Sequence, residues 1–152
     1  MTMGAETVFI DTNILIYATD DESPFHKKAL QMLNRFMAEG VECVISPQVV
    51  REYLVVLTRG MAPDDPARSV VFQNLEKLME TYPLLDENLD TVARLQSIIQ
   101  SCGITGKQIH DANIVAVMQV NEIKRLATYN LDDFRKYRQW IEILTLDNGE
   151  VL

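Results

Sequence analysis

Short apolar runs alternate with segments of helical periodicity along this chain. Strands are expected at residues 7–10, 42–45, 83–86, 124–128 and 141–146. Helices are expected at residues 14–18, 24–40, 46–59, 66–80, 88–102 and 107–120, with a short one entered from the polar turn at residues 130–134. This alternation predicts an α/β fold with a parallel sheet that helices cover on both faces.

Capping residues support several of these helix ends. Pro24 is expected to open the second helix and Gly40 to end it. Ser46, followed by proline, is a favourable N-cap, and Asn88 is another. Gly103 follows the helix that Asn88 begins. In open parallel sheets, sites form beyond the carboxyl ends of the strands, so residues that follow different strands are expected to meet there.

Length and composition are those of one globular domain spanning residues 1–152. The chain is 47% apolar and 24% charged, and no apolar stretch reaches the ~20 residues of a membrane helix. The first residues lack the layout of a signal peptide, so a cytoplasmic location is expected. Cys43 and Cys102 are far apart in sequence and are expected to be buried or half-buried thiols.

The net charge of −8 argues against a DNA-binding module, because a long-range positive field is absent. Acids that hold cations remain compatible with a nuclease. Asp11 follows the first strand and suits either a pocket edge or a helix N-cap. Asp111 lies on a helix that is apolar nearly all round, where a carboxylate is costly unless it is paired or holds a cation. The alternative for Asp111 is a first-turn acid favoured by the helix dipole.

Other acids carry weaker signals. Glu52 borders an apolar helix face, where a solvated glutamate near Arg59 is the better interpretation in isolation. Asn130, Asp132 and Asp133 follow a strand and suit either oxygen ligands or an Asx-turn. A set of carboxylate and amide oxygens suits Mg²⁺ or Mn²⁺, and such ions serve phosphodiester hydrolysis.

Four segments together resemble the PIN-domain nucleases, across almost the whole chain and in order. The segments are residues 10–14 (Ile-Asp-Thr-Asn-Ile), 46–52 (Ser-Pro-Gln-Val-Val-Arg-Glu), 110–116 (His-Asp-Ala-Asn-Ile-Val-Ala) and 127–134 (Ala-Thr-Tyr-Asn-Leu-Asp-Asp-Phe). The resemblance implies a three-layer α/β/α sandwich with a mainly five-stranded parallel sheet, and cleavage of single-stranded RNA that depends on Mg²⁺ or Mn²⁺. In the small single-domain branch it implies the toxin of a VapC-like type II toxin–antitoxin pair.

Carried over to this chain, the resemblance assigns metal-ligand positions to Asp11, Glu52 and Asp111. Thr12 or Asn13 would shape the first turn, and Ser46 the second. Many members have an aspartate in the fourth motif where this chain has Asn130. We favour Asp133 as the compensating fourth acid over Asp132, which is closer in spacing to Asn130.

Two other enzyme classes fit poorly. A haloacid-dehalogenase-type phosphatase needs a second aspartate where this chain has Asn13, and a dinucleotide-binding enzyme needs glycines after the first strand. The serious alternative is a PIN-like protein that has lost catalysis and acts as a binding or scaffold subunit.

Contacts with RNA and with protein partners are further expectations. Arg51, Arg59 and Lys107 are the cations best placed for an RNA backbone. His110 is expected to be a boundary residue, and His26 to lie on a solvated helix face. A homodimer and an antitoxin partner are implied by the resemblance. The apolar residues of the helix at 66–80 are interpreted as core packing, with a dimer interface as the alternative: Val70, Val71, Leu75, Leu78 and Met79.

Overall fold

The computed structural model describes residues 6–146. The strands are β1 (Thr7–Ile10), β2 (Glu42–Val44), β3 (Arg125–Ala127) and β4 (Glu142–Leu144). The helices are α1 (Thr12–Thr19), α2 (His26–Ala38), α3 (Pro47–Thr58), α4 (Ala67–Thr81), α5 (Leu89–Cys102), α6 (Gln108–Val120) and α7 (Leu131–Phe134), followed by the short 3₁₀ helix η1 (Arg135–Tyr137). The expected domain limits at residues 1 and 152 lie outside the described residues.

The four strands form one parallel sheet in the order β2-β1-β3-β4. The expected parallel α/β fold is therefore confirmed, with four strands in place of five. The expected strand at residues 83–86 is reduced to a single parallel bridge between Ile45 and Leu84. Its pairing ends there because Glu87 then turns to accept a hydrogen bond from the first turn of α3, and Asn88 starts α5.

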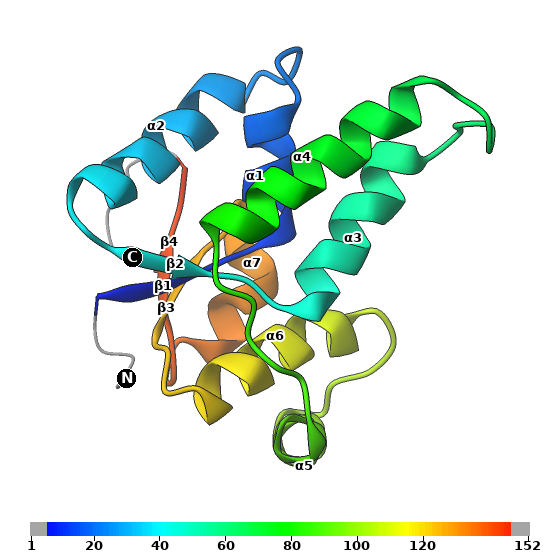
Figure 1. The fold of residues 1–152 in the computed structure, drawn as a ribbon. Coiled ribbons are helices and arrows are strands. Elements are labelled where there is room, and N and C mark those ends of the chain that lie inside the picture. The colour runs from blue at the N-terminus through cyan, green and yellow to red at the C-terminus, as the bar shows by residue number, and fades with distance from the viewer. Residues whose placement is uncertain (1–5, 147–152) are drawn as a thin grey trace.

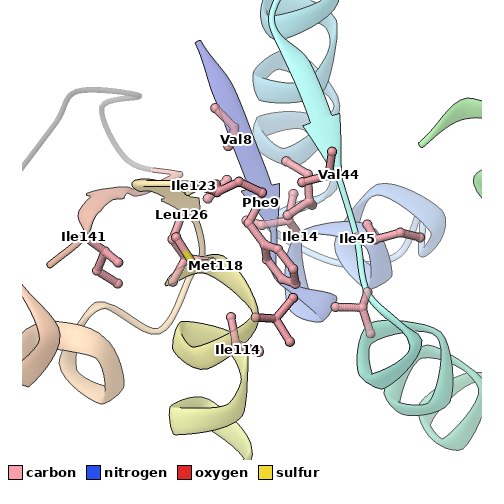
Figure 2. Packing of buried hydrophobic residues seen from close by; sticks show 14 of the residues in the cluster. Val8, Phe9, Ile14, Val44, Ile45, Ile114, Met118, Ile123, Leu126 and Ile141 are labelled. Carbon is pink, nitrogen blue, oxygen red and sulfur yellow. The ribbon is translucent and has the colours of Figure 1, made fainter. Parts of the chain in front are cut away.

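Helices cover both sides of this sheet (Figure 1). The helices α1 and α2 lie on one side and α5 and α6 on the other, while α3 and α4 extend from the first side as a pair (Figure 1). Burial explains why β1 carries no polar face: Val8, Phe9 and Ile10 have no exposed surface. Figure 2 shows Phe9 beside Ile114 of α6, which packs on the sheet. The fully covered central strand fixes the position of whatever follows Ile10.

Some helix ends lie where the capping residues predicted them, and others do not. Asn88 forms a capping box at the start of α5, and Gly103 ends it in the left-handed conformation at φ 63°, as expected. The second helix begins at His26, two residues after Pro24, and Ser23 accepts a hydrogen bond from the Phe25 N–H in the preceding turn. Within residues 6–146, none of the helices combines the length and hydrophobicity needed to cross a bilayer.

The apolar residues of α4 divide between core and surface. Val71 and Leu78 are buried and Leu75 packs against the core, which confirms the core interpretation for those three. Val70 and Met79 are 54% and 45% exposed, so core packing does not account for them. Cys43 is buried and Cys102 half-buried, and both are free thiols, as expected.

Candidate active site

The residues of the four sequence motifs meet at the carboxyl end of the sheet. A cavity of about 590 Å³ lies there, between the start of α1, the α3 helix and the start of α6. Among its lining residues are six of the predicted site residues and two of the predicted cations: Asp11, Thr12, Asn13, Glu52, Asp111 and Asn130, with Arg51 and Arg59. The parallel register of β1 and β3 causes this convergence, since Ile10 pairs with Ala127 and the next residues of each strand lie side by side.

Asp11 is a buried carboxylate held by neutral donors. Its Oδ1 accepts a hydrogen bond from the Thr12 backbone N–H at 2.8 Å, so it also serves as the N-cap of α1. Its Oδ2 accepts from Thr128 Oγ1 at 2.7 Å and from Asn13 Nδ2 at 3.3 Å. Burial raises the pKa of Asp11 to about 6, although the hydrogen bonds from Thr128 and Thr12 oppose that rise. The first acid is therefore fixed in position at a cost in desolvation.

Glu52 is held from both sides by side chains on other motifs. Thr12 Oγ1 donates to Glu52 Oε2 at 2.8 Å, and Gln48 Nε2 donates to Glu52 Oε1 at 2.7 Å. Gln48 Nε2 also donates to the His110 carbonyl at 2.9 Å, and Asn113 Nδ2 donates to Gln48 Oε1 at 2.7 Å. Glu52 is therefore a half-buried boundary residue whose two carboxylate oxygens are both held by side chains of the motifs, and not a freely solvated one.

Asp111 differs from the other two acids, since within residues 6–146 its carboxylate accepts no hydrogen bond. It lies in the first turn of α6, where the helix dipole lowers the pKa of an acid. Its pKa is nevertheless raised to about 7, first by burial and then by repulsion from Asp133, Asp11 and Glu52, with Lys136 opposing the rise. Burial and like charges thus outweigh both the dipole and the charge of Lys136.

The fourth motif divides its polar residues between the site and solvent. Asn130 lines the cavity, and its backbone N–H donates to Thr128 Oγ1 at 3.1 Å. Asp133 raises the pKa of both Asp11 and Asp111, so its charge lies near the site. Asp132 instead pairs with Arg135 at 3.0 Å, and its side chain is 88% exposed. The electrostatics therefore favour Asp133 over Asp132.

The chemistry of this donor set fits a divalent cation. The polar groups are carboxylate, amide and hydroxyl oxygens, which Mg²⁺ and Mn²⁺ prefer. Within residues 6–146, no lysine or arginine forms an ion pair with Asp11, Glu52 or Asp111. In that same part of the chain, no three His, Cys, Asp or Glu side chains already form a ready-made ligand cluster. The acids thus share one cavity and repel one another without a preformed coordination shell.

The predicted cations and histidines lie at different places. Arg51 and Arg59 line the cavity, and Arg51 Nη2 is 3.8 Å from Glu87 Oε2. Lys107 is exposed at the N-cap of α6 and does not line the cavity. His110 lines the cavity rim. His26 is half-buried and its Nδ1 is 2.8 Å from the Tyr17 carbonyl oxygen, so its assignment to a solvated face is wrong.

Ser46 occupies the N-cap position of α3, as predicted, but makes no capping hydrogen bond with its side chain. Its Oγ is buried and has no partner among the described residues. Glu87 supplies the missing acceptor, because its Oε1 accepts from the Gln48 backbone N–H at 3.2 Å.

Sequence reasoning missed three residues of the site, Gln48, Asn113 and Thr128. Gln48 is 3% exposed and links α3 to α6 through its amide, and Thr128 is fully buried beside Asp11. Gln48 and Asn113 lie within the quoted motifs, so a buried amide on an apolar helix face was the available signal. Thr128 offered no such signal, because its partner is 117 positions away.

Comparisons of the sequence with known proteins identify relatives. The sequence model of the PIN domain family matches residues 8–139. Ribonuclease VapC6 of Methanocaldococcus jannaschii is 25% identical over 157 aligned positions, which cover 93% of this chain and 99% of the relative. Ribonuclease VapC48 of Mycobacterium tuberculosis is 28% identical over 131 positions, covering 84% and 89% of the two chains.

Solved structures share the fold. A chain of the DNA-bound VapBC2 complex of Rickettsia felis superposes with a TM-score of 0.65 at 17% identity, covering 91% of this chain and 98% of the other. VapC20 of Mycobacterium tuberculosis, described as a toxin that cleaves the sarcin–ricin loop, has a TM-score of 0.65 at 16% identity and covers 84% and 93%. At these identities the likeness concerns the fold.

Proposed function

The chain belongs to the PIN domain family, and we propose that it is a metal-dependent endoribonuclease that cleaves single-stranded RNA. The observation that carries this proposal is the convergence of Asp11, Glu52 and Asp111 in one cavity where, among the described residues, no lysine or arginine forms an ion pair with any of the three. Burial and like charges raise the pKa of Asp11 and of Asp111, which is costly to the fold, and a bound divalent cation offsets that cost. The relatives named as ribonucleases support the same activity.

Asp11, Glu52 and Asp111 would hold Mg²⁺ or Mn²⁺, with Asp133 as the fourth acid and Asn130 as a neutral oxygen donor. The metal would supply an activated water and offset charge on the phosphate. The chain's own residues fix where the carboxylates stand. Thr128 and Asn13 orient Asp11 by donating hydrogen bonds to its carboxylate. Thr12, the residue after Asp11, donates its hydroxyl hydrogen to Glu52.

Gln48 has a positioning role in this scheme. Its amide holds one oxygen of Glu52 and also the backbone of His110, the residue before Asp111. The distance between the second and third acids therefore depends on one buried side chain. Outer hydrogen bonds of this kind orient ligands and tune their affinity for the metal.

The biological role we propose is that of a toxin in a type II toxin–antitoxin pair, located in the cytoplasm. The support comes from relatives, since the neighbouring structures include VapBC complexes. An antitoxin and a second copy of this chain are the proposed protein partners. Exposed apolar side chains on α3 and α4 offer surface for them: Val55, Val70 and Met79.

A cleavage assay tests the activity. The purified chain is incubated with a 5′-labelled single-stranded RNA and with the same RNA annealed to its complement, in Mn²⁺, in Mg²⁺ and in EDTA. We expect internal cleavage of the single strand in either metal and none in EDTA. Cleavage that persists in EDTA contradicts the metal dependence. A chain that cleaves no RNA under any condition favours the alternative of a binding or scaffold subunit.

A further inference from the structure

Three aromatic rings from separate segments form a cluster beside the acidic cavity. Tyr17 belongs to α1, Phe25 precedes α2, and Tyr129 follows β3. The ring centroids of Phe25 and Tyr129 are 4.5 Å apart, those of Tyr17 and Phe25 5.0 Å, and those of Tyr17 and Tyr129 5.5 Å. Each ring therefore contacts the other two, in the tilted and edge-on arrangements that aromatic pairs prefer.

The three rings are not equally buried. Tyr17 and Phe25 are half-buried and pack against the hydrophobic core. Tyr129 is 38% exposed and is not part of that core packing. The two inner rings thus form a support on which Tyr129 is held at the surface. An aromatic side chain mounted in this way loses little conformational freedom when a flat ligand stacks on it.

Two hydrogen bonds connect the backbone of Tyr129 to Asp11, one of the proposed metal ligands. The Tyr129 backbone N–H donates to Asn13 Oδ1 at 3.1 Å, and Asn13 Nδ2 donates to Asp11 Oδ2 at 3.3 Å. Tyr129 also lies between Thr128, which donates to Asp11, and Asn130, which lines the cavity. A nucleotide on Tyr129 would therefore be a near neighbour of a phosphate at the acids.

We infer that Tyr129, supported by Tyr17 and Phe25, is a stacking subsite for an unpaired nucleobase next to the scissile phosphate. The inference rests on the proposed function, because an RNA at the acids is what brings a base to this ring. Stacking on aromatic side chains is how proteins commonly hold unpaired bases. It also suits a chain of net charge −8, in which attraction to the phosphate backbone is weak.

Binding of RNA by three variants tests the subsite. The probe is a fluorescein-labelled single-stranded oligoribonucleotide of mixed sequence, measured by anisotropy in Ca²⁺, which can occupy oxygen ligands in place of Mn²⁺, with gel electrophoresis confirming that the probe stays intact. Tyr129→Leu keeps an apolar contact with the two inner rings but removes the π face, and we expect it to weaken binding about tenfold. Tyr129→Phe keeps the ring, and we expect it to bind within about twofold of the wild type. Phe72→Ala removes a comparably exposed ring on α4 and is expected to have no effect.

A second probe separates stacking from loss of structure. An oligomer of abasic ribose phosphates, which carries no bases, should bind the wild type and Tyr129→Leu equally. Equal binding of the base-containing probe by wild type and Tyr129→Leu, or wild-type binding too weak to measure, overturns the subsite. A chain that fails to cleave RNA but loses affinity in Tyr129→Leu keeps the subsite and refutes the nuclease. A chain that cleaves RNA with unchanged Tyr129→Leu binding does the reverse.

Discussion

The two ends of the parallel sheet carry cavities that differ in how deeply their charged groups are buried. At the carboxyl end, about 590 Å³ of space is bordered by acids from three elements, with Asp111 among them. At the amino end, about 710 Å³ is bordered by charged side chains of both signs, namely Arg94, Lys124, Arg138, Glu122 and Glu142, together with Trp140. The amino-end cavity is the larger, yet its cations are exposed on the surface. Polar groups there are solvated, so they cost the fold little.

The carboxyl-end acids, by contrast, are costly to the fold. Burial raises the pKa of Asp11 to about 6, and burial and like charges raise that of Asp111 to about 7. Groups that destabilise the apo-protein are retained where they serve binding or catalysis. The energetic cost of the lining groups, more than the size of a cavity, therefore indicates where the chemistry takes place.

The strongest test of this comparison removes one charged group from each end. Asp111→Asn is expected to lower the rate of Mn²⁺-dependent RNA cleavage by more than about 100-fold, because a metal ligand is lost. Arg138→Ala, at the other end, is expected to leave the rate within about twofold. Initial rates on the labelled single strand measure both. A large loss in Arg138→Ala, or none in Asp111→Asn, reverses the assignment of the two ends.

The next test concerns a neutral side chain at each end. Gln48→Ala is expected to lower cleavage about 10- to 100-fold, since Glu52 loses the donor to its Oε1. Gln119→Ala removes the same kind of side chain from the amino-end cavity and is expected to have no effect on cleavage. A positioning role also predicts weaker Mn²⁺ binding in Gln48→Ala. If Gln48→Ala loses activity while its Mn²⁺ affinity is unchanged, the amide does not act through the ligands.

A smaller effect is expected on stability as the pH changes. Both acids have a raised pKa in the folded state, so the folded state holds their protons more tightly than the unfolded state. Their contribution therefore favours folding at about pH 4 and is lost as the pH rises through about 6 to 7. In EDTA at about pH 8, Asp111→Asn should be more stable than the wild type by about 1 to 2 kcal/mol, a value reduced for screening of a half-buried group.

Thermal or urea unfolding at the two pH values measures this difference. The gain in Asp111→Asn should disappear at about pH 4, where the wild-type carboxyl is protonated. Asp132→Asn serves as the control, because its side chain is exposed and paired with Arg135. A gain of equal size in Asp132→Asn would show that net charge, and not the buried site, sets the effect.

Local sequence patterns predicted most elements and singled out Asp11 and Asp111 as candidates, whereas Glu52 was a candidate mainly through the family resemblance. Asp11 follows a strand with no polar face, and Asp111 stands on an apolar helix, so each is unusual in its own segment. The links between segments were not predictable in this way. Gln48 of α3 meets Asn113 of α6 across 65 positions, which depends on how the two helices pack. Thr128 meets Asp11 across 117 positions, through the register of β1 and β3.

The predicted fifth strand, at residues 83–86, also shows that local patterns do not contain tertiary contacts. Residues 83–86 have a strand-like composition, but Ile45 makes only two backbone hydrogen bonds with them, one to the Pro83 carbonyl and one from the Leu85 N–H. The pairing ends because Glu87 accepts a hydrogen bond from the Gln48 backbone N–H in α3 and Asn88 caps the start of α5. Tertiary contacts of neighbouring residues, which a local pattern does not contain, set its length.

Calorimetric titration with Mn²⁺ at about pH 8 measures whether the carboxyl-end acids bind a divalent cation. The wild type is expected to bind Mn²⁺, Asp111→Asn to lose that binding, and Asp133→Asn to weaken it. Asp132→Asn and Arg138→Ala should bind as the wild type does. Repeating the titration at about pH 5.5 should lower the wild-type affinity, because protons compete for Asp11 and Asp111. Mn²⁺ binding that is the same in the wild type and Asp111→Asn would contradict the account.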